Sequence, residues 1–124
     1  NNGTCTKKMV LNGLYQESVF KGAAMGMPYE GHSTIGFDNA KKMFVSSSID
    51  NMGSGIMNMQ GNWDAATKSL TLTGTETDPV TGKDMHVREV MKLADDNNQT
   101  MEMYGPGPDG KEIKMMEIKF TRKK

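Results

Sequence analysis

Short runs of alternating apolar and polar residues, separated by turn-forming residues, limit most strongly what this chain can fold into. Successive side chains of a β-strand point to opposite faces, so a period of two is typical of strands with one buried face. No long stretch keeps the three-to-four-residue apolar spacing of an amphipathic helix. We expect nine strands, at residues 4–11, 13–22, 29–38, 42–50, 54–63, 68–77, 83–94, 98–105 and 110–122.

Turn signals separate these strands. Asn12-Gly13 is a strong hairpin signal because both residues tolerate positive φ. The segment 78–83 contains Pro79 near its start and offers Gly82 for a left-handed position. One loop design occurs twice, with an Asp whose side chain can accept from backbone N–H groups of the turn. Its copies are Phe37-Asp38-Asn39-Ala40-Lys41-Lys42 and Trp63-Asp64-Ala65-Ala66-Thr67-Lys68.

These features predict an all-β fold, an antiparallel up-and-down meander forming a closed barrel or half-barrel of about nine strands. A parallel sheet needs long crossover connections, usually helices, and none is available here. The last strand changes its apolar parity between Met115 and Met116, which predicts a β-bulge there. Such a bulge helps a sheet to curl.

Charge and composition exclude several classes of protein. The 15 Lys and Arg residues balance the 15 Asp and Glu residues, which argues against nucleic acid as a partner. No apolar run is long enough to be a membrane-spanning helix. A single Cys cannot form an internal disulfide and fits a cytoplasmic or a periplasmic protein equally well. The basic C-terminal strand, with alternating lysines, is typical of a solvated outer face.

Methionine is the unusual component, with 13 residues in a chain that also holds 14 Gly. The pairs Met25/Met27, Met57/Met59 and Met101/Met103 have an M-x-M spacing, which puts both thioethers on one face of a strand. Thioether sulfur suits Cu(I), but Met is also an adaptable filler of irregular interiors and pockets. We favour the lining of a core or pocket, and expect Met25 and Met27 in a loop. His32, His86 and Cys5 do not have the spacing of a zinc site, so we expect no metal or cofactor.

Polar residues interrupt several of the apolar faces. Glu89 lies between Val87 and Met91 on its expected face, and a buried carboxylate is costly unless it is paired, neutral or hydrated. Ser47 occupies a similar position between Val45 and Ile49. We therefore predict a binding site for a small apolar or amphipathic ligand. Its expected residues are Gln16, Ser33, Ser47, Met57, Met59, Glu89, Met101 and Met103.

Two alternatives stay open: a structural or protein-interaction domain with a Met-filled core, and an unrecognised enzyme. The chain has no G-x-S-x-G motif, and Gly53-Ser54-Gly55 is expected to form a turn because no helix follows it. We therefore predict no catalytic residues.

Several motifs, spread over nearly the whole chain, are together specific enough to indicate a family. They are Met25 to Gly31, Ile35 to Asn39, Ile49 to Met57, Thr77 to Lys83, Val87 to Val90, Thr100 to Tyr104 and Gly107 to Glu112. With them the chain resembles an uncharacterised bacterial domain-of-unknown-function family with a lipocalin/calycin-like β-barrel. The resemblance implies a single lipocalin-like barrel domain over residues 1–124 and assigns no catalytic residue.

Members of that family have a preceding strand that starts with a Gly-x-Trp-like motif, and this chain begins after it. We therefore expect one strand to be missing and an edge strand to be open. An open edge favours pairing with another chain, so a homodimer through that edge is expected.

Overall fold

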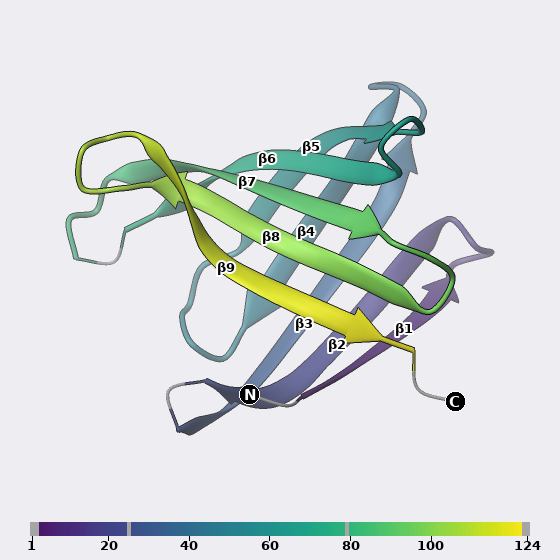
Figure 1. The fold of residues 1–124 in the computed structure, drawn as a ribbon, viewed down its shortest axis with the longest axis horizontal. Coiled ribbons are helices and arrows are strands. Elements are labelled where there is room, and N and C mark those ends of the chain that lie inside the picture. The colour runs from purple at the N-terminus through teal and green to yellow at the C-terminus, as the bar shows by residue number, and fades with distance from the viewer. Residues whose placement is uncertain (1–2, 25, 79, 123–124) are drawn as a thin grey trace. The chain divides into compact units, whose positions relative to one another are not determined.

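The computed structural model describes residues 3–24, 26–78 and 80–122, and in these residues it contains strands and turns but no helix (Figure 1). The predicted all-β class is confirmed, and each predicted strand is present with ends that differ by a few residues. The strands are β1 (Thr4–Val10), β2 (Tyr15–Ala24), β3 (Met27–Asp38), β4 (Met43–Asp50), β5 (Met57–Asp64), β6 (Ser69–Thr77), β7 (Asp84–Leu93), β8 (Asn98–Pro106) and β9 (Glu112–Thr121).

Contacts within the chain divide it into two compact units, Asn1–Asn58 and Met59–Lys124, called here the N-terminal and C-terminal units. In the N-terminal unit, β1, β2, β3 and β4 pair in sequence order, each antiparallel to the next. In the C-terminal unit, β5 to β9 pair in the same way. The predicted antiparallel meander is therefore confirmed within each unit.

The turns have the predicted chemistry. Asn12 and Gly13 both have positive φ, at 63° and 77°, and Gly82 has a φ of 71°. Pro79 lies outside the described residues.

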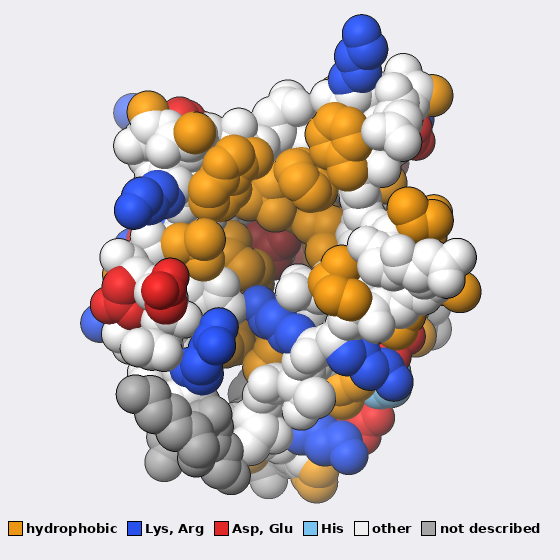
Figure 2. Space-filling view, turned by 90° about the vertical axis from the view of Figure 1, so that its right-hand side faces the viewer, with side chains coloured by type: hydrophobic (Ala, Val, Ile, Leu, Met, Phe, Trp, Pro, Cys, Tyr) orange, Lys and Arg blue, Asp and Glu red, His pale blue; other side chains and the backbone are white. Residues whose placement is uncertain are grey.

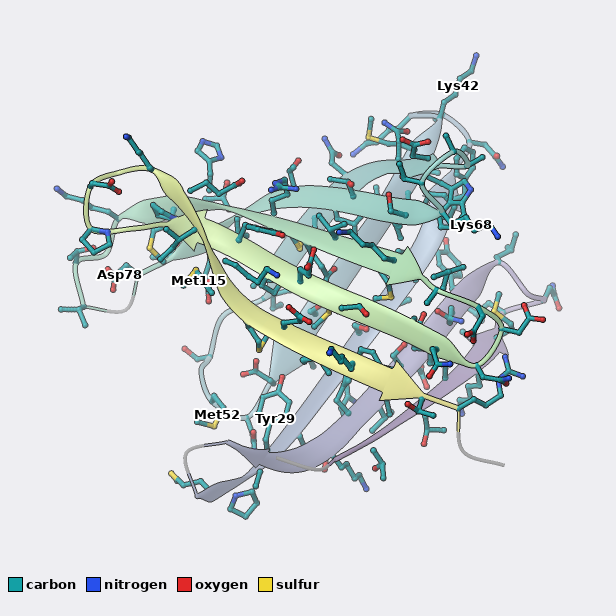
Figure 3. All side chains as sticks on the ribbon, viewed as in Figure 1. Tyr29, Lys42, Met52, Lys68, Asp78 and Met115 are labelled. Carbon is teal, nitrogen blue, oxygen red and sulfur yellow. The ribbon has the colours of Figure 1, made fainter. Side chains whose placement is uncertain are left out.

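The repeated loop is also confirmed. The Asp38 carboxylate accepts hydrogen bonds from the backbone N–H groups of Ala40 (2.9 Å) and Lys41 (3.1 Å). Asp64 accepts from the backbone N–H of Ala66 at 2.9 Å. Both loops end on a lysine with positive φ, Lys42 at 57° and Lys68 at 52°, and both are labelled in Figure 3. The shared sequence therefore produces two turns of the same local form.

The bulge in β9 is confirmed at Met115, which is labelled in Figure 3. Met103 of β8 pairs with Met116, whereas the next residue, Tyr104, pairs with Lys114. Met115 is therefore the extra residue that has no partner in the ladder, and it reverses the side to which the first part of β9 points.

Candidate functional site

The C-terminal unit has one apolar sheet face that is rich in methionine. The registers align Leu72, Glu89, Met103 and Met116 in one row across β6 to β9. The next row on the same face holds Leu70, Met91, Met101 and Ile118. We call this surface the methionine face, made of Met59, Leu70, Leu72, Val87, Glu89, Met91, Met101, Met103, Met116 and Ile118.

Burial is uneven across the methionine face. Leu72 and Met101 are only 3% and 7% exposed, and Met59 is buried as well. On the same face, Met116 is 46% exposed and Trp63 is 43% exposed. Trp63 pairs with Leu70 at the start of the second row. The face therefore combines a packed centre with apolar side chains that contact solvent.

Glu89 lies in the middle of the methionine face. Leu72 and Met103 are its cross-strand partners, and Val87 and Met91 flank it on the same side of β7. The side chain is half-buried. Glu89, Met59, Met101 and Met103 therefore share one face, as the alternation predicted.

The predicted site residues of the N-terminal unit are divided between two faces. Gln16 pairs with Ile35, and Ser33 pairs with Ser18, so Gln16 and Ser33 lie on the same face and are both half-buried. Ser47 pairs with Thr34 on the opposite face and is exposed. Met57 is half-buried in β5, two residues before Met59.

Ser47 is therefore separated from Gln16 and Ser33, with which it was expected to share a site. Its neighbours Val45 and Ile49 suggested an apolar face, but Ile49 is 51% exposed. Phe44 and Ser46 alternate with them and lie on the face of Gln16 and Ser33. Both faces of β4 carry apolar and polar side chains, so alternation alone does not identify the buried one.

Ser47 lines an open pocket of about 230 Å³ on the N-terminal unit, and it alone of the lining residues was expected in the ligand site. The other lining residues are Tyr15, Thr34, Val45, Ser46 and Asn58. A Cβ on Gly36 would collide with the ring of its cross-strand partner Tyr15, so this glycine allows the ring to lie close against β3. In the sequence, the signal that could have indicated this pocket was a glycine, Gly36, on the strand that pairs with the aromatic Tyr15.

The opposite face of the C-terminal unit carries a network of charges centred on Glu102. Glu102 is buried, with 7% of the residue exposed. Its carboxylate contacts Lys114 (2.9 Å), Lys92 (3.3 Å) and the Tyr104 hydroxyl (3.0 Å). Hydrogen bonds from Lys114, and then from Tyr104, lower the pKa of Glu102 from 4.5 to about 2. Lys114 also contacts Glu117 at 3.0 Å, and both carboxylates raise the pKa of the lysine.

A second ion pair extends this network. The Arg88 guanidinium donates to both carboxylate oxygens of Glu112, at 2.7 and 3.1 Å, and lies 4.2 Å from the centre of the Tyr104 ring. Such a two-point contact fixes the geometry of both side chains. The charges on this face are thus arranged as pairs, which is the pattern of a structural network.

The candidate metal ligands are separated in the structure. Among the described residues, no three His, Cys, Asp or Glu side chains are grouped to hold a metal ion. His32 contacts Glu30 at 2.6 Å, and burial raises the pKa of the Cys5 thiol. Met25 lies outside the described residues, while Met27 begins β3 instead of lying in the expected loop.

Within the described part of the chain, no helix has the length and apolar character to cross a membrane. A comparison with curated proteins found no match to this sequence. Residues 1–122 match the family described as "Protein of unknown function (DUF1579)". Because this match spans nearly all of the chain, the protein belongs to the DUF1579 family.

Proposed function

We propose that this protein binds a small apolar or amphipathic molecule on the methionine face. The observation that carries the proposal is the position of Glu89, a single carboxylate at the middle of two rows of Leu and Met side chains. Ligand sites combine an apolar wall with a few polar groups that set the ligand's orientation. Glu89 would supply that polar group.

The methionines suit this role because of their flexibility. A thioether side chain is unbranched, polarizable and able to adopt many shapes, so a surface of Met101, Met103 and Met91 adapts to different apolar ligands. A surface that served only as a packed core would favour Leu or Ile, whose rotamers are better defined. The exposed Trp63 on β5 and Met116 on β9 would supply partly hydrated margins at opposite sides of the methionine face.

The first experiment is native mass spectrometry of gently purified protein, compared with the mass under denaturing conditions. We expect a non-covalent adduct that is lost on denaturation. The purified chain is then titrated with N-phenyl-1-naphthylamine, an uncharged apolar fluorophore, and saturable enhancement of its emission is expected.

Two isosteric variants identify the site. Glu89→Gln keeps the shape of the side chain but makes it a weaker acceptor for the amine N–H of the fluorophore, and it is expected to weaken binding by roughly tenfold. Glu76→Gln is the matched control. Glu76 lies on the same side of β6 as Leu70 and Leu72, but it is exposed and lies beyond the two packed rows. Absence of saturable binding, or equal affinities for all three proteins, would count against the proposal.

Self-association is the second candidate function, and an observation on β9 favours it. Ile113, Met115 and Met116 of this strand are 45%, 56% and 46% exposed. A homodimer through β9 would cover them. The bulge at Met115 and the lysines of β9 oppose it, because both features discourage pairing of a strand with another chain. Sedimentation velocity of the full chain distinguishes a monomer from a dimer. A monomer at all concentrations would exclude self-association.

A further inference from the structure

The turn between β1 and β2 exposes an apolar side chain in a strained conformation. Leu11 has a φ of 53° and is followed by Asn12 and Gly13, which also have positive φ. Asn and Gly accept this left-handed region readily, whereas a Leu side chain does so at a steric cost. Leu11 is also 69% exposed, so packing offsets little of that cost. A residue that breaks two local preferences without compensation points to a role outside the fold.

Leu11 belongs to a group of exposed apolar side chains at one end of the N-terminal unit. Leu14 is 64% exposed, Met9 58% and Phe37 49%. Tyr15, next to Leu14, pairs with Gly36, next to Phe37, so the β1–β2 turn and the end of β3 lie at the same end of the sheet (Figure 1). We call this group the apolar tip, made of Met9, Leu11, Leu14 and Phe37.

The apolar tip is partly held in place by its neighbours. The ring of Phe37 meets that of its cross-strand partner Phe44 edge to face, with the centroids 5.1 Å apart. The backbone N–H of Leu14 donates to the carbonyl oxygen of Leu11 at 3.3 Å. The side chains are therefore presented to solvent from a hydrogen-bonded turn and an aromatic pair.

Lysines lie near the apolar tip, on the β3–β4 turn and along β1. Lys41 and Lys42 lie exposed on the β3–β4 turn at this same end, with Lys42 at its outermost point in Figure 3. Lys7 and Lys8 belong to β1.

Among the described residues of the N-terminal unit, two carboxylates lie near this end. Glu17 is 3.8 Å from Lys8, and Asp38 accepts from the backbone of its own turn. In the described residues of the N-terminal unit, the four lysines near this end outnumber the two carboxylates, so this end carries a positive charge in a chain whose net charge is zero. Figure 2 shows one face of the molecule, on which Lys and Arg side chains (blue) and hydrophobic ones (orange) both reach the surface.

We propose that the apolar tip docks the protein on an anionic lipid surface. Apolar side chains beside cationic ones are the combination that holds a protein at a membrane interface, because the first enter the headgroup boundary while the second meet anionic lipid. Leu11 and Leu14 provide the inserted side chains, and Lys41 and Lys42 provide the contacts with lipid phosphates. This docking is independent of ligand binding on the methionine face.

The test is flotation of the full chain with vesicles of phosphatidylcholine alone or mixed with phosphatidylglycerol. We expect binding to the anionic vesicles that weakens as salt is added. The double variants Leu11→Asn with Leu14→Asn, and Lys41→Gln with Lys42→Gln, are each expected to bind roughly tenfold more weakly. Val80→Asn is the control and binds like the wild type, because Val80 is 89% exposed but belongs to the β6–β7 loop.

Folding does not obscure this test, because Asn accepts the positive φ of position 11. Circular dichroism checks that each variant keeps its β-sheet signal. Failure of the wild type to float with anionic vesicles overturns the proposal, as does unchanged binding of the Leu variant. A dimer that forms without lipid and is lost in the Leu variant, with no flotation, would assign the tip to a second copy and also overturn it.

Discussion

Lys114 lies 2.9 Å from the buried carboxylate of Glu102 because Met115 bulges out of β9. Beyond the bulge, Glu102 pairs with Glu117 and Met103 with Met116. In a regular ladder Tyr104 would then pair with Met115, and Lys114 would point to the methionine face. The extra residue shifts Lys114 opposite Tyr104, on the side of Glu102. One irregularity therefore keeps a lysine out of the apolar surface and places it in the charge network.

Deleting Met115 is expected to keep the contact between Lys114 and Glu102. The pairs Met103–Met116 and Tyr104–Lys114 would then follow each other in a regular ladder, so Lys114 would stay opposite Tyr104, on the side of Glu102. The control is Met115→Ala, which keeps the bulge and removes a side chain that is 56% exposed, and should cost less than about 1 kcal/mol. Urea unfolding followed by tryptophan fluorescence measures both variants. The two variants should have similar stabilities, and a deletion variant that is several kcal/mol less stable than Met115→Ala would contradict this account of the bulge.

Glu102 is expected to make stability depend on pH in the acid range. Its pKa is about 2 in the folded protein against an ordinary value of 4.5, so folding favours the ionised carboxylate. The resulting stabilisation is fully present above pH 4.5 and is lost as pH falls from 4.5 through about 2.

The variant Glu102→Gln isolates this effect, because the isosteric amide keeps the shape of the side chain without its charge. It should be less stable than the wild type at pH 7, and the difference should shrink toward pH 2. Thermal unfolding across this range measures both proteins. A difference that stays constant with pH would show that the ion pairs of Glu102 are not its source.

Leu11→Asn is expected to stabilise the protein. Asn adopts positive φ at a lower steric cost than Leu, so the free energy of unfolding should rise by about 1 kcal/mol. Leu14→Asn is the matched control, since it also replaces an exposed leucine in the same turn but has no positive φ. Chemical denaturation measures the free energy of unfolding of both variants. A destabilised Leu11→Asn would mean that the leucine side chain supports the fold.

Gly61→Ala is expected to lower the free energy of unfolding by about 3 kcal/mol. A Cβ at Gly61 of β5 would run into the backbone carbonyl of Thr71 on β6, which cannot move without breaking the ladder. Gly53→Ala serves as the control, because the surroundings of Gly53 are open. The same denaturation experiment should show little change for Gly53→Ala, and similar losses in both variants would contradict the steric account.

Local chemistry made the turns predictable from sequence. Asp38 and Asp64 contact backbone groups two or three residues away, and Gly82 takes the left-handed position that its turn requires. Each of these interactions depends on residues that are close together in the chain. The bulge at Met115 was predictable for the same reason, because the change of parity occurs within one strand.

Long-range pairing made other features unpredictable. The side of the sheet on which Ser47 lies depends on the register of β4 with β3, which the mixed composition of both faces of β4 does not specify. The contact between Glu102 and Lys114 joins two strands and requires the register of β8 with β9 as well as the bulge. Arg88 similarly finds its partner Glu112 on another strand. A pattern within one strand contains no information about these partners.

The central claim is that the methionine face binds an apolar ligand, and methyl NMR of the protein labelled at the methionine methyl groups tests it most directly. The chain is titrated with decanol, decanoate and decylamine, and resonances are assigned by single Met→Leu variants. We predict saturable shifts of Met91, Met101, Met103 and Met116, with Met52 and Met9 unchanged because they lie in the N-terminal unit. Shifts confined to Met9 and Met52, or no saturable shift of any methionine, would contradict the account.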